Sequence, residues 1–344
     1  MTLVELLRAR PIVQAPMAGG ASTPELVAAV SGAGGLGFLA AGYLSPAALA
    51  ERVRAVREAG VTAFGVNVFV PQPTTSPDAA ASYRPLLQGE AERYGTPPGA
   101  PVHDDDAWAA KIDLLTEAAV PVVSFTFGCP DDDVLDRLRA AGSATVVTVT
   151  TVAEAGEAVA RGADGVCAQG VEAGGHRAAF DPALSADRPL RELLPDVVAA
   201  VDVPVIATGG IMDGADVARV LSSGAAAAQL GTAFLRCPES GAHPAHKAAL
   251  ADPAFTETTL TRAFTGRPAR GLVNRFVAEH PEAPHAYPEV HHMTRPLRAA
   301  AASAGDPHGM ALWAGTGFRR ATDAPAAEVV ARLRREAAGA GARV

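Results

Sequence analysis

The stretch VPVIATGGIMDGADVARVLSSGAAAAQLGT, residues 203–232, predicts the fold of this chain. It opens on a run rich in β-branched residues and turns at Gly209 and Gly210. A helix candidate follows, preceded by Asp213 and interrupted at Gly224, and the stretch ends in a second apolar run. A buried strand, a capped helix and another buried strand are the parts of a βαβ unit with parallel strands.

The same unit recurs along the chain. Helix candidates such as TPELVAAVSGAG and SPAALAERVRAVREAG separate eight apolar runs, at 11–17, 36–41, 62–69, 120–127, 144–150, 165–170, 203–210 and 225–232. Eight buried parallel strands that alternate with helices close most economically into a TIM (β/α)8 barrel. A doubly wound open sheet is the alternative.

Composition excludes several classes of protein. The chain has 344 residues, 49% of them hydrophobic, and a formal net charge of −8 with both signs interspersed, so we expect a large core and no nucleic-acid partner. No apolar run approaches the roughly 20 residues of a membrane helix, and residues 1–17 do not read as a signal peptide. The three cysteines, Cys129, Cys167 and Cys237, are far apart and odd in number, which indicates a reducing, cytoplasmic location.

Two segments depart from the repeat and suggest the domain organisation. Residues 71–110 are rich in proline and turn formers and are predicted to be a loop insertion at the barrel mouth. Residues 236–319 are predicted to form a mainly helical substrate subdomain, inserted after the eighth strand. Residues 1–235 and 320–344 would then form the barrel, with 324–340 as a last amphipathic helix packed against it.

The ends of the strands are the candidate site, because in such a barrel the following loops converge on one face. Glycines after the seventh and eighth strands leave N–H groups free at helix starts, which suits a phosphate. The amides of Asn67 and Gln169 suit the mixed edge of an isoalloxazine ring, although they could equally bond to loop backbone. The predicted cofactor contacts are Ala15, Pro16, Met17, Asn67, Gln169, Gly174, Gly175, Gly209, Gly210, Gln229, Leu230, Gly231 and Thr232.

His176, in CAQGVEAGGHRAAF (167–180), is the candidate catalytic residue. Two glycines before it would let the chain approach a ligand, and imidazole is the most frequent general base near neutral pH. The alternative is an exposed histidine without a role. No metal site is expected, because the histidine pairs in HPAHK (243–247) and VHHM (290–293) lack a carboxylate or cysteine cluster.

A series of motifs resembles the nitronate monooxygenase family, formerly called 2-nitropropane dioxygenases. The motifs are PIVQAPMAGG (11–20), GLGFLAAGY (35–43), FGVNVFVP (64–71), VSFTFGCP (123–130), AQGVEAGGHR (168–177), PVIATGGI (204–211), QLGTAFL (229–235) and the region from YPEVHH to LWAGTG (287–317). The resemblance implies FMN-dependent oxidation of alkyl nitronates by O2, with nitroalkanes as further substrates, to carbonyl compounds and nitrite. It implies that His176 is the general base, and that the subdomain covers a substrate pocket in which we place Tyr287 and Trp313.

Two departures from the family pattern are visible. Thr316 follows LWAG where glutamine is more usual, and Ala178 follows Arg177 where glycine is more usual. These departures affect the expected structure of the lid and the expected substrate more than they affect the expected flavin site. The alternative enzyme is an FMN-dependent NAD(P)H:quinone or enoyl-thioester reductase. The alternative that is not an enzyme is a flavin-binding module without activity. The expected assembly is a monomer or a homodimer.

Overall fold

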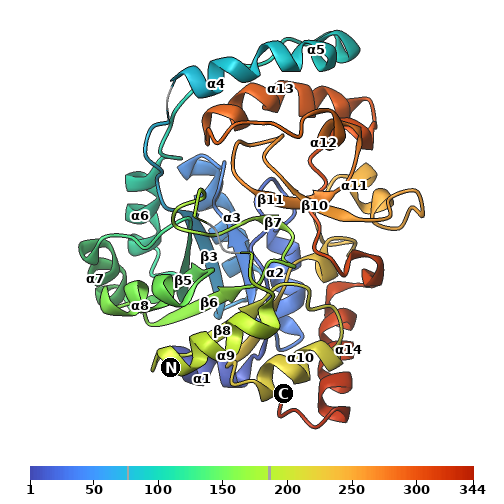
Figure 1. Cartoon of the computed structure of the whole chain (residues 1–344). Helices are drawn as coiled ribbons and strands as arrows, with labels where there is room; N and C mark the ends of the chain where they lie inside the picture. Colours follow the sequence, from blue (N-terminus) through green and yellow to red (C-terminus); the bar gives the residue numbers. More distant parts are fainter. Residues whose placement is uncertain (76, 185–186) are drawn as a thin grey trace.

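The computed structural model describes residues 1–75, 77–184 and 187–344, and its main body is a parallel barrel (Figure 1). All eight predicted runs form strands whose order is β1-β9-β8-β6-β5-β4-β3-β2, and a parallel bridge between Val13 and Leu36 brings β1 next to β2. The TIM barrel prediction is confirmed. The strands are β1 (Ile12–Gln14), β2 (Gly37–Ala40), β3 (Phe64–Phe69), β4 (Val122–Thr126), β5 (Ala144–Val149), β6 (Gly165–Gln169), β8 (Val205–Thr208) and β9 (Ala227–Leu230).

Helices surround the barrel, and side-chain caps fix where several of them begin. Thr23, Ser45, Thr151 and Asp213 each accept a hydrogen bond from the backbone N–H three residues later. The last helix, α14, packs against α10 and α2, as predicted. The helices are α1 (Leu3–Ala9), α2 (Pro24–Gly32), α3 (Pro46–Glu58), α6 (Trp108–Glu117), α7 (Asp132–Ala140), α8 (Val152–Ala160), α9 (Leu190–Ala200), α10 (Gly214–Ser222) and α14 (Ala326–Gly339).

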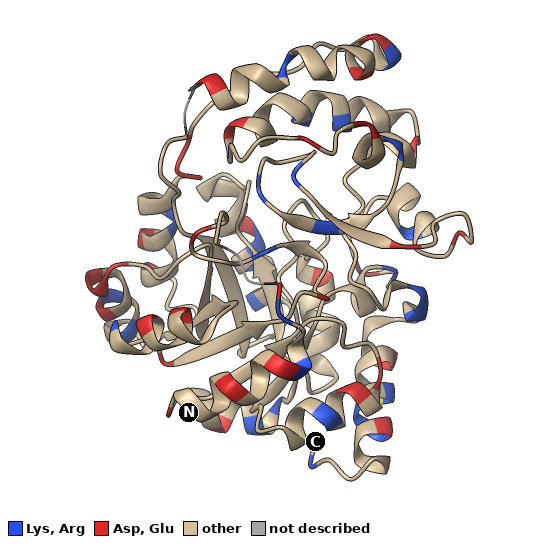
Figure 2. Cartoon of the chain, in the orientation of Figure 1, with Lys and Arg blue, Asp and Glu red and all other residues tan. Residues whose placement is uncertain are grey.

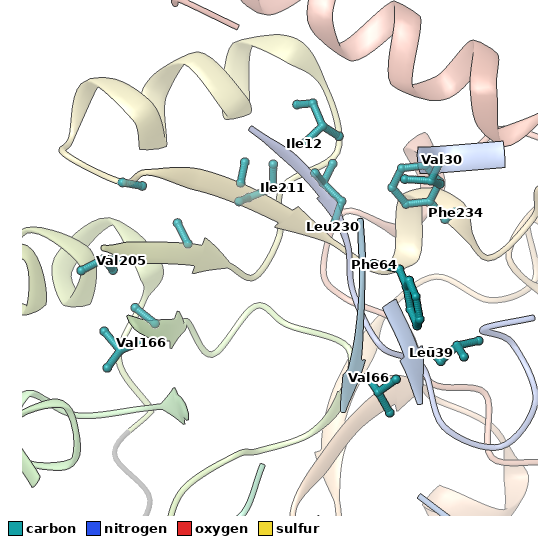
Figure 3. Close-up of a cluster of buried hydrophobic side chains, with 14 of the residues drawn as sticks. Ile12, Val30, Leu39, Phe64, Val66, Val166, Val205, Ile211, Leu230 and Phe234 are labelled. Atoms are coloured by element: carbon teal, nitrogen blue, oxygen red, sulfur yellow. The ribbon is translucent and has the colours of Figure 1, made fainter. Parts of the chain in front are cut away.

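Alternate residues of the strands face opposite sides of the barrel wall. The outward side chains, among them Ile12, Leu39, Phe64 and Val205, are buried under the helices (Figure 3). The inward side chains of the lower layer are apolar, and α1 packs against them with Leu3, Leu6 and Leu7. This lower layer comprises Val13, Phe38, Val122, Val146, Cys167, Ile206 and Ala227. One end of the barrel is thus filled with apolar side chains, which leaves the other end for a site.

Gly37 lies where α2 approaches β2 most closely. A Cβ atom there would come within 2.8 Å of both the Cα and the carbonyl oxygen of Val27, which are backbone atoms of α2. Gly37→Ala is therefore expected to lower the free energy of unfolding by about 1–3 kcal/mol, measured by urea denaturation. The control is Gly32→Ala, because no atom lies within 4 Å of its Cβ position. Equal unfolding midpoints for the two variants would refute this account of the packing.

A second layer lies above the open end of the barrel (Figure 1). It contains α11 (Pro244–Ala249), α12 (Arg275–Glu279) and α13 (Glu289–Ser303), with short 3-10 turns at Thr232–Phe234 (η2), Pro307–Gly309 (η3) and Phe318–Arg320 (η4). It also contains an unexpected antiparallel sheet in the order β10 (Thr258–Thr261), β11 (Ala269–Leu272), β7 (Gly175–His176). The division into a barrel of 1–235 and 320–344 and a subdomain of 236–319 remains our proposal.

The segment 71–110 differs from the predicted loop. Its described part forms α4 (Pro77–Tyr83), η1 (Pro85–Leu87) and α5 (Gln88–Tyr94), which lie along α13 on the outside of the upper layer (Figure 1). Position 76 is outside the described residues. Tyr83 donates to the carbonyl oxygen of Ala263 at 2.9 Å, and Tyr94 donates to Asp306 at 2.7 Å. The apolar residues that anchor these helices form too short a pattern to predict helices within a proline-rich sequence.

Charged residues are distributed over both layers. Figure 2 shows acidic and basic segments interspersed along the helices, in agreement with the sequence. None of the helices in the described part of the chain is long and apolar enough to cross a membrane.

Candidate active site

A cavity of about 320 Å3 lies between the carboxyl ends of the strands and the upper layer. Its size falls within the range of small-molecule sites. His176 and Trp313 line it, and so do all the predicted cofactor contacts: Ala15, Pro16, Met17, Asn67, Gln169, Gly174, Gly175, Gly209, Gly210, Gln229, Leu230, Gly231 and Thr232. Tyr287 does not line it but lines a smaller adjoining pocket. The roles of all these residues stay predictions.

The floor of the cavity is the upper layer of inward strand residues, and unlike the lower layer it is polar. In β4, β5, β6, β8 and β9, the residue two positions after the apolar side chain of the lower layer carries an amide or a hydroxyl. The polar residues of this layer that line the cavity are Asn67, Thr126, Thr148, Gln169, Thr208 and Gln229. The change from apolar to polar within one strand repeat marks the boundary between core and site.

Asn67 and Gln169 use their amides differently. The Asn67 Nδ2 donates to Ser124 and Thr126 at 3.0–3.2 Å, which leaves its Oδ1 as an acceptor at the cavity wall. The Gln169 Oε1 accepts from Arg177 at 2.9 Å and from the backbone N–H of Ala178 at 3.0 Å, and its Nε2 donates to the carbonyl oxygen of His176 at 3.0 Å. Gln169 therefore holds the segment that carries the histidine, which is the backbone-bonding alternative left open by the sequence.

Glycine is required at each of the two positions before His176 for a different structural reason. A Cβ atom on Gly174 would lie 2.5 Å from the backbone nitrogen of Gly315, so this glycine permits contact between two loops rather than approach to a ligand. Gly175 has φ +78°, in the left-handed region that favours glycine. From there the chain enters β7 and pairs with β11, where His176 faces Ala269. The histidine is thus held by a strand and not by a free loop.

The imidazole of His176 is half-buried and held in one orientation. Its Nε2 lies 3.0 Å from the Oγ1 of Thr265, and that hydroxyl donates to the carbonyl oxygen of Arg267 at 3.2 Å. Because the hydroxyl proton is used there, Thr265 accepts from Nε2–H, and the lone pair of the neutral ring is on Nδ1. Burial and the positive charges of Arg267 and Arg298 lower the pKa of His176 to about 3. The ring is therefore neutral at physiological pH.

Aromatic rings surround His176. Their centroids lie 5.5 Å (Phe127), 5.6 Å (Trp313), 5.9 Å (Tyr287) and 6.5 Å (Phe69) from that of the imidazole. Tyr287 is therefore close to the histidine although it lines the adjoining pocket. The space beside the imidazole is narrow and mainly apolar, so it suits a small apolar group.

Glycines form a cradle at the other end of the cavity, after β8 and β9. Gly209 and Gly210 have φ values of +123° and +70°. Among the described residues, no backbone acceptor is recorded for the N–H groups of Gly209, Gly210, Gly231 and Thr232. Free amides in this position after the last two strands of a barrel form an anion site.

The LWAGT loop, residues 312–316, closes the cradle from above. The hydroxyl of Thr232 accepts from the backbone N–H of Gly315 at 3.0 Å, and the backbone N–H of Thr316 donates to Glu172 at 3.1 Å. The hydroxyl of Thr316 lies 3.5 Å from the position that a Cβ on Gly210 would take. The departure at Thr316 thus lies in the loop that covers the cradle.

Tyr43 and Arg298 are cavity residues that sequence reasoning missed. Tyr43 follows β2 with φ +67°, and its backbone N–H donates to the carboxylate of Asp106 at 3.0 Å. Its hydroxyl lies 3.3 Å from that of Tyr287. The only signal for Tyr43 was its position two residues after the second apolar run.

One group of side chains in the described part of the chain is close enough together to hold a metal ion: Glu90, Glu279 and His280. It lies in the upper layer, on α5 and at the end of α12, and Arg275 forms ion pairs with both carboxylates. The histidine pairs seen in the sequence are not part of it. His246 faces the carbonyl oxygen of Trp313 at 3.1 Å, and His292 pairs with Asp104 at 2.8 Å.

Thr265→Val tests how the histidine is oriented. Valine keeps the volume of threonine but removes the hydroxyl that accepts from Nε2–H of His176, so the ring loses its fixed tautomer. For a neutral nitroalkane, the substrate that the sequence motifs imply, we expect kcat to fall by about tenfold, in line with the loss of one hydrogen bond of about 1.4 kcal/mol. Thr145→Val is the control, since Thr145 is equally buried but does not line the cavity and bonds to Asp164. An unchanged kcat in Thr265→Val would exclude this role.

Comparison with known proteins gives a consistent picture. The model of a family described as "Nitronate monooxygenase" matches residues 1–336. A nitronate monooxygenase from Paraburkholderia phytofirmans is 41% identical over 339 residues, which cover 95% of this chain and 92% of the relative. The structure of nitroalkane oxidase from Streptomyces ansochromogenes superposes with a TM-score of 0.95 at 54% identity, over 98% of both chains. FabK from Thermotoga maritima superposes with a TM-score of 0.76 at 27% identity, over 98% of this chain and 96% of that one.

Proposed function

This chain belongs to the nitronate monooxygenase family of oxidoreductases, and on that premise we propose that it oxidises small alkyl nitronates with O2 to carbonyl compounds and nitrite, using FMN. The proposal includes neutral nitroalkanes as substrates, with His176 as the base that removes the proton next to the nitro group. The observation that carries it is the neutral imidazole of His176, fixed by Thr265 and lining the same cavity as the glycine cradle.

The cavity fits FMN. The free N–H groups of Gly209, Gly210, Gly231 and Thr232 suit the phosphate, and side chains at Gly209 or Gly210 would require backbone conformations that few residues adopt. The free Oδ1 of Asn67 and the polar floor suit the edge of the ring system. When bound, FMN would supply the electron acceptor that nitronate oxidation needs and pass the electrons to O2.

The chain's own contribution begins with the Nδ1 lone pair of His176. A neutral nitroalkane in the aromatic pocket would give its α-proton to Nδ1, and the C–H electron pair would become the negative charge of the nitronate. Arg267 and Arg298 disfavour the imidazolium that forms, but they stabilise the anion that forms with it. A preformed nitronate needs no base, so for that substrate the residues only bind and orient.

The pocket also suggests the size of the substrate. Phe69, Phe127, Tyr287 and Trp313 leave little space around the imidazole. Short alkyl groups fit such an aromatic enclosure, whereas long or charged groups would need to displace a ring. We therefore propose short-chain nitronates as substrates.

An FMN-dependent NAD(P)H:quinone or enoyl-thioester reductase is the second candidate. The likeness to FabK covers nearly the whole chain, so the barrel and upper layer by themselves do not distinguish the two activities. The protonation state of the histidine favours the first candidate, because a reductase needs a proton donor to complete the reduction of its substrate, whereas the neutral Nδ1 of His176 can only accept a proton.

The test is an anaerobic titration of the purified protein, first with propyl-2-nitronate and separately with NADH, followed by visible absorbance. We expect the flavin absorbance to be bleached by the nitronate and not by NADH, and aerobic turnover to release acetone and nitrite. Bleaching by NADH alone would assign the protein to the reductases. A colourless protein that does not take up FMN would remove the basis of the proposal.

A further inference from the structure

Arg298, on α13, places a positive charge at the wall of the cavity without a carboxylate beside it. Its pKa is lowered to about 10 because the guanidinium is desolvated, and it is therefore a cation at neutral pH. Among the described residues, it forms no ion pair with an Asp or Glu. The ionisable groups that affect its pKa are Arg295 and Tyr43, and Tyr43 is neutral at physiological pH because burial raises its pKa to about 12. A desolvated cation without a counter-charge is unfavourable, so an anion in the cavity would stabilise it.

Neutral groups hold the guanidinium in place. Nε donates to the Oγ1 of Thr294 at 3.1 Å, and Nη2 donates to the carbonyl oxygen of His291 at 3.0 Å and lies 3.2 Å from its Nδ1. The ring of His291 is stacked on Tyr43 with centroids 4.1 Å apart. No partner within the described residues is recorded for Nη1. One edge of the guanidinium is thus bound to the helix, and the other is available to a ligand.

Arg267, the other cation near His176, is different. Its Nε and Nη2 donate to the carbonyl oxygens of Arg177 and Ala179, its Nη1 donates to Gln72 at 2.6 Å, and its guanidinium lies 4.0 Å from the centroid of Phe127. All three nitrogens have partners, and the side chain is 1% exposed. Arg267 therefore fixes the loops, whereas Arg298 can bind a ligand.

The position of Arg298 indicates which anion it would bind. Its charge acts on His176 and on Tyr43, and all three line the cavity. The glycine cradle follows β8 and β9 and already offers free N–H groups to a phosphate. We propose that Arg298 binds the negatively charged oxygens of the nitronate and determines the preference for the anionic substrate. The inference rests on the proposed function, because it assigns the contact that recognises that substrate.

The experiment compares Arg298→Met and Arg298→Lys with the control Arg295→Gln. Arg295 lies one turn earlier on α13, is exposed, and lines the smaller adjoining pocket but not the cavity. Its replacement changes the net charge equally. Initial rates are measured with propyl-2-nitronate and with neutral 2-nitropropane. Binding of nitrate, a planar anion that is not oxidised, is measured by calorimetry at constant ionic strength. FMN content and thermal unfolding are recorded for each variant.

In Arg298→Met we expect KM for the nitronate to rise at least about 30-fold, the equivalent of losing one partner of a buried charge pair. Nitrate binding should disappear, while FMN content stays unchanged. For neutral 2-nitropropane, kcat should fall and KM should change little, because the charge forms only during the reaction. Arg298→Lys should keep part of both effects, since lysine retains the charge without the planar fork. Arg295→Gln should resemble the wild type.

Three results would overturn the inference: nitrate binding that survives in Arg298→Met, a KM for the nitronate no higher than in Arg295→Gln, or loss of FMN in Arg298→Met, which would make Arg298 a ligand of the cofactor. If Arg298→Met does not fold, the same criteria apply to Arg298→Lys. Failure of the proposed function looks different. In that case the wild type binds nitrate through Arg298 but does not oxidise the nitronate.

Discussion

Replacement of His176 by asparagine is expected to lower kcat/KM for neutral 2-nitropropane by about 10²–10⁴, the usual contribution of a general base. Asparagine is similar in size and can still donate to the hydroxyl of Thr265, so the pocket should keep its shape. It has no basic lone pair, and the α-proton then has no acceptor. Oxidation of preformed propyl-2-nitronate needs no proton transfer, so it should decrease by less than about tenfold.

The pH dependence gives a second, independent expectation. An ordinary histidine becomes protonated below about pH 6.5 and would then be inactive as a base. The pKa of His176 is lowered to about 3 by burial and by Arg267 and Arg298, so its lone pair remains available as the pH falls. The kcat/KM for 2-nitropropane should therefore show no break between pH 5 and 8 that His176 could cause, measured over the range in which the protein stays folded.

The matched control is His308→Asn, which makes the same chemical change at an exposed histidine outside the cavity. It should leave both substrates unaffected. Three measurements are sufficient: steady-state rates with the nitroalkane, steady-state rates with the nitronate, and FMN content. Equal losses for the two substrates in His176→Asn would show that the histidine binds or positions the substrate and is not the base.

The sequence was sufficient to predict the barrel because its strands are buried on both faces. Each is a continuous apolar run, and glycine and capping residues mark the ends of the helices between them. The cavity wall followed from this, since the strand ends of one barrel must converge. The boundary between core and site is also visible in the sequence, because a polar residue follows an apolar one two positions later, as in Ile206 and Thr208 or Cys167 and Gln169.

The upper layer was less predictable because its structure depends on distant contacts. β7 has only two residues, and its partner β11 begins at Ala269, more than ninety positions after Gly175. No local periodicity can indicate such a pair. Arg298 was missed for a related reason. It lies on an amphipathic helix, where an arginine normally faces solvent, and only the packing of α13 over the barrel turns it toward the cavity.

Gly210→Asp is expected to weaken FMN binding at least about 100-fold, because a carboxylate in the cradle would lie beside the phosphate, and adjacent like charges cost several kcal/mol. A side chain at Gly210 would also adopt φ +70° and place its Cβ 2.9 Å from that of Glu172. Aspartate tolerates this backbone region better than most residues, so the charge, rather than the strain, should dominate. The protein should therefore be purified colourless but folded.

Gly60→Asp separates the two effects. Gly60 also has a positive φ, of +80°, and no atom lies within 4 Å of its Cβ position, but it precedes β3 at the opposite end of the barrel. The Gly60→Asp variant carries the same backbone change and the same added charge. Its FMN content and its Kd for FMN should equal those of the wild type. The Kd is measured by titration of the deflavinated protein, followed by fluorescence quenching. If Gly210→Asp binds FMN as tightly as Gly60→Asp does, the phosphate does not occupy the cradle. The free amides after β8 and β9 would then need another explanation, and the orientation proposed for the cofactor would be wrong.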